Sequence, residues 1–215
     1  MNRITYITSK ATGYQTIADV GCDHAFISIN AVKNYGVSKA YALDINDGPL
    51  ENARLNVLSN NLSDKIEIIK SDGLSNLYSF VECIIIAGMG GVLISKILND
   101  SQEKANASKK LILSPNNEEP ILREYLMKNN FMIVDEDIIY DSGHYYEIIE
   151  AVPNNYQELS RLDILFGPVL RKKKSELFIK KYTKRLNILE ASYKKCSASS
   201  KEEIENNIKL LKEIL

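Results

Sequence analysis

Residues 17–24 read Ile17-Ala18-Asp19-Val20-Gly21-Cys22-Asp23-His24, and this stretch decides the fold. Small and apolar residues run directly into Gly21, which predicts a short buried strand that ends in a glycine turn. At such a turn, backbone amides can approach a ligand closely. The second and third glycines of the dinucleotide fingerprint are missing, and an acid, Asp23, stands in their place. A carboxylate repels a pyrophosphate but attracts a cationic amine, so the loop favours S-adenosylmethionine over a dinucleotide.

Two further strand-like runs also end in acidic residues. Residues 39–45 end in Asp44-Ile45, and residues 66–69 lead into Asp72-Gly73. In a doubly wound sheet, an acid after the second strand reaches the ribose hydroxyls of a nucleotide. An acid after the third strand would lie near the adenine amine. A single Asp after a strand is usually a helix cap, whereas three acids in this order favour an adenosyl site.

Strand-like runs and helical patterns alternate over the first 152 residues. We predict strands at residues 16–20, 39–43, 66–69, 83–87, 110–114, 131–140 and 145–152, and helices near 25–35, 48–60, 90–99 and 118–129. Only residues 141–144 join the last two strands, and this link is too short for a parallel crossover. The pattern predicts the α/β fold of class I (Rossmann-like) methyltransferases, a seven-stranded sheet with an antiparallel last strand and helices on both faces.

The chain changes character after about residue 156. Gly167-Pro168 interrupts it, and a long helical pattern then starts. Apolar residues recur every three or four positions at Leu170, Leu177, Tyr182, Leu186, Leu189 and Tyr193, and after residues 196–200 at Ile204, Ile208, Leu211 and Leu215. This spacing predicts a coiled-coil-like antiparallel helical hairpin. We therefore predict a methyltransferase domain over residues 1–155 and a helical hairpin domain over residues 156–215.

Charge is divided between the two parts. Residues 1–167 hold 14 basic and 22 acidic residues, whereas residues 168–215 hold 13 basic and 6 acidic residues. An acidic body with a basic tail suggests that the tail binds a polyanion. The alternative is a solvated lysine-rich helix face, or a hairpin that serves only packing or dimerisation.

Composition excludes several classes of protein. The hydrophobic fraction of 45% is ample for a core, but no apolar stretch approaches the 18 residues that would span a membrane. Residues 1–13 lack the apolar region of a secretory signal. The three cysteines show no Cys-x-x-Cys spacing and there are only two histidines, so we predict a reducing, cytoplasmic setting and no metal site.

A second motif follows the fourth predicted strand, where Ala87-Gly88-Met89-Gly90-Gly91 ends a fully apolar run. Class I methyltransferases place the acceptor atom at this strand end. Amino-methylating enzymes of DNA often have Asn-Pro-Pro-Tyr there, which this chain lacks. Its glycines instead leave room for a flat base. We therefore predict an acceptor pocket lined by Gly88, Met89, Gly90 and Gly91, which would position the base and take no part in acid or base chemistry. The alternative is an ordinary glycine turn that opens the next helix.

Taken together, these motifs resemble the bacterial tRNA adenine-22 N1-methyltransferase family over nearly the whole length. The resemblance rests on Asp19-Val20-Gly21-Cys22-Asp23-His24-Ala25-Phe26, Asp47-Gly48-Pro49-Leu50, Ala87-Gly88-Met89-Gly90-Gly91, Pro115-Asn116, Leu122-Arg123, Asp141-x-Gly143-x-x-Tyr146-Glu147 and Phe166-Gly167-Pro168-Val169-Leu170. The chain departs from the family at Cys22, Ile27-Ser28 and Ser114. None of these changes removes an expected acid or glycine.

The resemblance implies transfer of a methyl group from S-adenosylmethionine to N1 of the adenosine at tRNA position 22, with S-adenosylhomocysteine as the product. The residues implied in cofactor binding are Asp19, Gly21, Cys22, Asp23, His24, Asp44, Ile45, Asp72, Gly73, Ala87 and Gly88. The residues implied in tRNA binding are Arg3, Arg171, Lys172, Lys173, Lys174, Lys180, Lys181, Lys184 and Arg185. We predict a monomer, with a homodimer through the helical hairpin as the alternative.

Neutral adenine carries a lone pair and no proton at N1, so the reaction needs no general base and depends on positioning. N1 lies on the pairing edge, so the base must be unpaired or flipped out. Tyr78, Tyr145 and Tyr146 are candidates for stacking against it. Three alternative functions remain: a methyltransferase for another RNA, a small molecule or a protein; a non-catalytic RNA-binding module; and, least favoured, a dinucleotide-dependent oxidoreductase.

Overall fold

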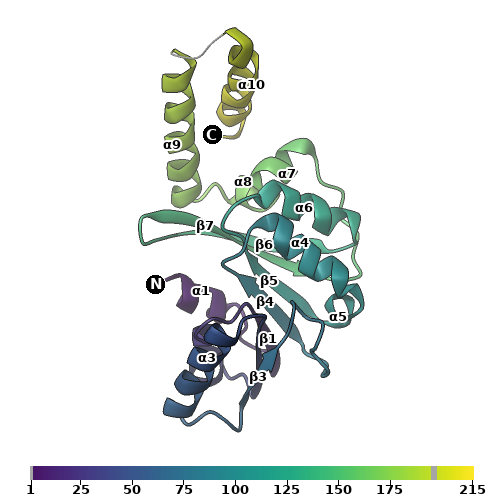
Figure 1. Cartoon of the computed structure of the whole chain (residues 1–215). Helices are drawn as coiled ribbons and strands as arrows, with labels where there is room; N and C mark the ends of the chain where they lie inside the picture. Colours follow the sequence, from purple (N-terminus) through teal and green to yellow (C-terminus); the bar gives the residue numbers. More distant parts are fainter. Residues whose placement is uncertain (1, 195–197) are drawn as a thin grey trace.

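The computed structural model describes residues 2–194 and 198–215 and contains one seven-stranded sheet (Figure 1). Its strands are β1 (Thr16–Val20), β2 (Lys39–Asp44), β3 (Ile66–Lys70), β4 (Cys83–Ala87), β5 (Lys110–Ser114), β6 (Met132–Asp141) and β7 (His144–Val152). They lie in the order β3-β2-β1-β4-β5-β7-β6, and β7 runs antiparallel to both of its neighbours, β5 and β6. The predicted strands and their hairpin are confirmed.

Helices cover both faces of the sheet. One face carries α1 (Arg3–Ser9), α2 (Phe26–Asn34) and α3 (Asp47–Ser59), and the other carries α4 (Gly91–Asp100), α5 (Gln102–Ala107) and α6 (Glu119–Lys128). The central strand β4 shows why a continuous apolar run is required. Ile84 and Ile86 join the core on the α4 side, whereas Cys83 and Ile85 join the core on the α1 side.

The sequence did not predict α1 or α5. Both helices are shorter than the length at which an isolated helix is stable in water, and neither has enough turns to show a periodic apolar pattern. Tertiary contacts stabilise α1 instead, because the Tyr6 hydroxyl donates to Asp137 at 2.6 Å and Lys10 binds carboxylates of β6 and β7. The N-terminal helix is therefore fastened across the sheet, close to the ends of β4 and β5.

The β6–β7 hairpin extends beyond the rest of the sheet. β7 pairs with β5 only from Ile149 to Ala151, while β6 and β7 stay paired as far as Asp141 and His144. Because β7 runs antiparallel to β5, residues 144–147 continue past Ser114, the carboxyl end of β5. We call residues 138–148 the overhang; it reaches outward near α1 and α9 (Figure 1).

After residue 156, the described residues form the helices α7 (Arg161–Phe166), α8 (Leu170–Lys173), α9 (Glu176–Tyr193) and α10 (Ala198–Ile214). The single long helix expected from Leu170 is wrong, because Lys174 adopts a left-handed φ of 42° and Ser175 caps a new helix. α9 and α10 lie antiparallel and form the predicted hairpin (Figure 1). Of the predicted link at residues 196–200, Cys196 and Ser197 lie outside the described residues.

A buried ionic network fixes α9 to the body. The fully buried Arg123 guanidinium of α6 donates to Glu136 at 2.8 Å and to Glu147 of β7. The Glu147 carboxylate also accepts from Lys181 at 2.6 Å and from the Tyr182 hydroxyl at 2.9 Å, both on α9. Burial alone would raise the pKa of Glu147, but Arg123 and Lys181 outweigh it and lower the pKa to about 2.

Candidate functional site

Two clefts meet at the carboxyl edge of the parallel strands. The β2 cleft, of about 350 Å³, is lined by the ends of β1 to β4 and by α4; the α1 cleft, of about 340 Å³, is lined by α1 and the β1–α2 loop. Both clefts are lined by Gly21, Ala87 and Gly88. Their combined size suits one extended small molecule that crosses Gly21.

The β2 cleft brings together the acids predicted at the second and third strand ends. Asp44, Ile45, Asp72 and Gly73 all line it, together with Met89. One Asp44 oxygen accepts from the Asn46 amide at 3.0 Å, which leaves acceptor capacity on the carboxylate. Two carboxylates in a narrow cleft can accept hydrogen bonds from hydroxyl and amine groups of a ligand.

Asp19 is placed differently from its prediction. It lines neither cleft; it is buried and accepts hydrogen bonds from the Ser28 amide at 3.2 Å and the Ser28 hydroxyl at 2.8 Å. The N-cap residue of α2, Ala25, offers no side-chain acceptor, so Asp19 takes that role from β1. Burial raises the pKa of Asp19 to about 6, although the bonds from Ser28 oppose the rise. Asp19 therefore supports the ligand loop from behind.

Two features of the structure favour glycine at position 21. Its φ is +74°, in the left-handed region, and an added Cβ would lie 2.1 Å from the Met89 Cε. Met89 packs across Gly21 and also lines the β2 cleft. The first and second motifs of the sequence thus meet in direct contact at the junction of the two clefts.

The α1 cleft carries charges of both signs. Cys22, Asp23 and His24 line one side, with His24 Nε2 3.7 Å from an Asp23 oxygen and its ring stacked on the half-exposed Phe26. Arg3 of α1 also lines the cleft. A zwitterionic group would find a carboxylate and a guanidinium in the same space.

Arg3 and Asn116 fix the position of the loop that begins at Gly88, after β4. The Arg3 guanidinium donates to the Ser114 carbonyl at 2.8 Å and to Asn116 Oδ1 at 3.0 Å, and it lies 4.0 Å above the Tyr146 ring. Asn116 Nδ2 in turn donates to the Gly88 carbonyl at 2.7 Å. Sequence reasoning missed this role of Asn116, although the residue belongs to a quoted motif.

The four predicted acceptor residues separate into two pairs. Gly88 and Met89 line a cleft, whereas neither cleft includes Gly90 or Gly91. The Gly91 amide donates to the Asn117 carbonyl at 3.0 Å, and a Cβ on Gly91 would lie 2.3 Å from the Glu118 carbonyl oxygen. Gly90 and Gly91 therefore allow two loops to pack closely, which supports the pocket from outside.

The predicted tRNA-binding cations also differ in their surroundings. Lys173 pairs with Asp135 at 2.6 Å, Lys181 with Glu147, Arg171 with Asp163, and Lys180 with Glu176. Within the described ranges, no carboxylate forms an ion pair with Lys172, Lys174, Lys184 or Arg185. These four cations remain free of internal partners there.

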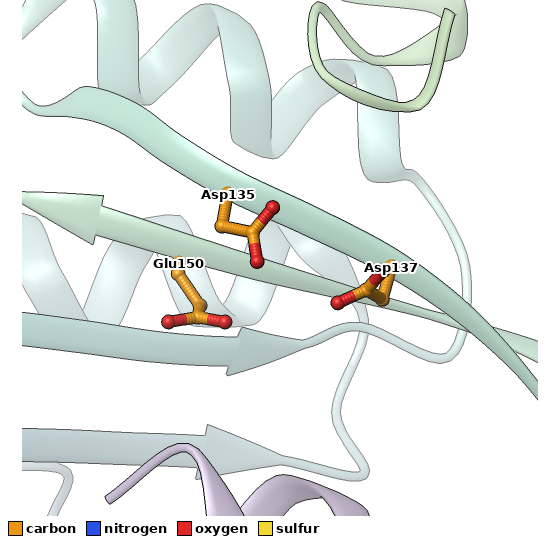
Figure 2. Close-up of side chains that lie close together, drawn as sticks. All are labelled: Asp135, Asp137 and Glu150. Carbon is orange, nitrogen blue, oxygen red and sulfur yellow. The ribbon is translucent and has the colours of Figure 1, made fainter. Parts of the chain in front are cut away.

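One group of carboxylates has the spacing of a metal site. Asp135 and Asp137 of β6 and Glu150 of β7 point toward one another (Figure 2). Lys10 lies 3.3, 2.8 and 2.8 Å from them, Lys173 contacts both aspartates, and Lys110 contacts Glu150. Burial would raise the pKa of Asp137, but hydrogen bonds from Lys10 and Lys173 lower it. The lysine ammonium groups already neutralise the cluster, which anchors α1.

Over residues 2–194 and 198–215, every helix is too short or too polar to cross a bilayer.

Comparisons with known proteins agree with this geometry. The family model described as tRNA (adenine(22)-N(1))-methyltransferase matches residues 17–214. The tRNA (adenine(22)-N(1))-methyltransferase of Bacillus subtilis is 33% identical over 213 residues, which cover 93% of this chain and 90% of that protein.

The fold prediction is confirmed by solved structures that are similar over nearly the whole chain. Streptococcus pneumoniae Sp1610 in complex with S-adenosyl-L-methionine has a TM-score of 0.92 at 33% identity and covers 100% of both chains. M. capricolum TrmK in complex with S-adenosyl-homocysteine has a TM-score of 0.88 at 29% identity and covers 98% of this chain and 95% of that one.

Proposed function

Because the chain belongs to the tRNA (adenine(22)-N(1))-methyltransferase family, we propose that its two clefts bind S-adenosylmethionine and present the methyl group to N1 of adenosine 22 of tRNA. The chain is an S-adenosylmethionine-dependent tRNA methyltransferase, and S-adenosylhomocysteine is its product. The observation that supports the placement is the junction at Gly21 and Gly88, where a cleft rich in acids meets a cleft with both charges.

The cofactor would lie with its nucleoside in the β2 cleft. Asp44 is placed to accept from the ribose hydroxyls, and Asp72 with Gly73 borders the position of the adenine. Ile45 would cover the ring, because its side chain is exposed at the same edge. Gly21 and Ala87 would leave room for the sulfonium at the junction.

The amino-acid tail of the cofactor would lie in the α1 cleft, beside Cys22 and His24. Asp23 would face its ammonium group and Arg3 its carboxylate, because the two side chains line the same cleft with opposite charges. Arg3 was expected at the tRNA; its place in the α1 cleft and its bonds to Ser114 and Asn116 favour the cofactor.

The transfer step is a single in-line displacement. The N1 lone pair forms the new bond to the methyl carbon while the carbon–sulfur bond breaks and its electron pair stays on sulfur. No proton moves, so the chain needs no general base, and its contribution is to align the two reactants and exclude water. Gly88, held by Asn116 and shared by both clefts, is the residue we place at the point of transfer.

For the tRNA, we propose that residues 1–155 form the catalytic domain and residues 156–215 bind the RNA backbone. The unpaired cations Lys172, Lys174, Lys184 and Arg185, with the exposed Lys180, would contact phosphates, whereas Lys173, Lys181 and Arg171 hold the structure together. We place this activity in the cytoplasm, where the substrate tRNA is found, and assign it to a monomer.

The direct test is methylation of unmodified tRNA with labelled S-adenosylmethionine, followed by digestion to nucleosides. We expect 1-methyladenosine from wild-type tRNA and none when adenosine 22 is replaced by guanosine. Label at another nucleotide of the tRNA would show that the enzyme methylates a different position. Absence of label in tRNA, despite measured cofactor binding, would favour a small molecule or protein as acceptor.

Reversing two free charges on α9 is expected to weaken tRNA binding selectively. The variant Lys184→Glu/Arg185→Glu should lose about tenfold or more in tRNA affinity at low salt and should show a shallower salt dependence, because fewer counterions are released on binding. Filter binding across a salt series measures both quantities. The matched control Lys65→Glu changes an exposed lysine at the opposite edge of the sheet. Equal losses in both variants would mean that general charge, rather than α9, controls binding.

A further inference from the structure

The overhang of the β6–β7 hairpin lies between α1, which lines the α1 cleft, and the hairpin of α9 and α10, which we call the arm. On one face, its Asp141 carboxylate accepts from the Arg3 amide at 3.1 Å, and the Tyr146 ring lies under the Arg3 guanidinium. On the other face, Tyr145 packs against the cluster that includes Phe178 and Tyr182 of α9. The overhang lies between α1 and α9 (Figure 1), so we place it beside an RNA that contacts α9 and also reaches the clefts.

The length of the overhang makes it a projecting element. Residues 144–147 continue past the last residue of β5, and four residues of strand span roughly 13 Å. The projection is on the carboxyl side of the sheet, which is also the side of both clefts. The hairpin thus stands beside the place where the target base must enter.

An aromatic pair lies near the end of the overhang. Tyr140 and Tyr145 are directly opposite in the β6–β7 register, with ring centroids 4.8 Å apart. Tyr145 is partly buried against the arm, but Tyr140 is 51% exposed. A large ring that is half exposed, and held in place by a second ring, presents a rigid apolar face to solvent.

The chemistry of the reaction calls for such a face. N1 lies on the pairing edge of adenine, so the base must leave its stack before it can be methylated. Extrusion leaves neighbouring bases with an uncovered face, and proteins commonly cover exposed bases with aromatic side chains. The basic residues of α9 can hold phosphates but cannot replace a lost stacking partner.

We propose that Tyr140, supported by Tyr145, is an RNA-contacting residue that stacks on a tRNA base next to the extruded adenosine. This inference rests on the proposed function for the identity of the RNA and adds a stacking surface to its phosphate contacts. Tyr140 acts on the substrate nucleic acid only, at a distance from the cofactor.

The test compares Tyr140→Ala, Tyr140→Phe and Phe80→Ala for equilibrium tRNA binding and for methylation. We expect Tyr140→Ala to lose about tenfold in tRNA affinity and in kcat/KM for tRNA, because base–aromatic stacking contributes on this scale. Tyr140→Phe keeps the ring and should match the wild type. Phe80, which is 58% exposed and precedes β4 at the end of the sheet opposite the clefts, is the matched control and should show no loss.

Two further readouts separate stacking from other roles. The loss in Tyr140→Ala should stay constant between about 50 and 200 mM salt, whereas loss of a phosphate contact would vary with salt. Cofactor affinity and thermal stability should equal those of the wild type. A fall in either would show that the ring supports Arg3 and the fold, and would overturn the proposal, as would wild-type tRNA binding by Tyr140→Ala. Absence of 1-methyladenosine from the wild-type enzyme would instead overturn the proposed function, while the binding comparison would still decide the role of Tyr140.

Discussion

Replacing Gly21 with alanine is expected to lower kcat/KM by about tenfold or more, through loss of S-adenosylmethionine affinity. The backbone at this position has a φ of +74°, which costs an L-residue roughly 1–2 kcal/mol. The added Cβ would also lie 2.1 Å from the Met89 Cε, so Met89 has to move. Met89 lines the β2 cleft, so a shift of its side chain changes the lining of the space where we place the cofactor. Calorimetric titration with the cofactor and steady-state methylation measure the two effects.

Gly36→Ala is the matched control for this variant. Gly36 has a nearly identical φ of +75°, but nothing lies within 4 Å of an added Cβ. Backbone strain should therefore lower the thermal stability of both variants, whereas cofactor affinity should fall only in Gly21→Ala. The double variant Gly21→Ala/Met89→Ala should regain part of the affinity, because it removes the contacting methyl group. Wild-type affinity in Gly21→Ala would show that the cofactor does not cross this glycine.

The sequence predicted the elements whose signals are local. Each of the seven strands, the antiparallel end of the sheet and the acids Asp44 and Asp72 follow from short patterns within one segment. The contact between Gly21 and Met89 could be anticipated only in outline, because the two residues lie on different motifs. Asp19 shows the limit of such reasoning, since an acid that follows a strand can face the ligand or cap the next helix, and the sequence does not distinguish these positions.

What the sequence could not predict depends on long-range contacts. α1 has no amphipathic pattern of useful length, and it is held by carboxylates more than 120 residues away in the chain. Without α1 in view, the hydrogen bond between Arg3 and Asn116 could not be predicted. For the same reason, the exposed ring of Tyr140 was overlooked among twelve tyrosines, because its exposure arises from the projection of the hairpin beyond β5.

The number of charges in the basic tail does not show which of its cations are available to RNA. The excess of lysine and arginine after residue 168 suggested a polyanion-binding surface, but a count does not reveal which cations have internal partners. Lys181 is half-buried between Glu119 and Glu147, and Lys173 joins α8 to the aspartates of β6. Part of the basic tail therefore attaches the arm to an acidic body, and only the remainder is available to RNA.

Removing the Arg123 guanidinium is expected to be the most destabilising single change in the ionic network that joins α9 to the body. Arg123→Ala leaves the buried carboxylates of Glu136 and Glu147 without their shared cation, and loss of one partner of a buried pair typically costs about 3–5 kcal/mol. Urea unfolding at neutral pH measures the loss. The exposed pair Lys128–Glu124 on the same helix is the control, and Lys128→Ala should leave the free energy of unfolding nearly unchanged.

The pH dependence gives this prediction a second test. The folded-state pKa of Glu147 is about 2, below its ordinary value of 4.5, so its stabilising contribution is present above pH 4.5 and is lost as the pH falls toward 2. The difference in stability between wild type and Arg123→Ala should therefore narrow over that range, because protonated carboxyl groups no longer need the cation. The variant Arg123→Met/Glu136→Gln/Glu147→Gln should recover much of the loss at neutral pH, since a neutral set avoids buried unpaired charge. A loss below about 1 kcal/mol in Arg123→Ala would mean that apolar packing of Phe178 and Tyr182, rather than the ionic network, holds the arm on the body.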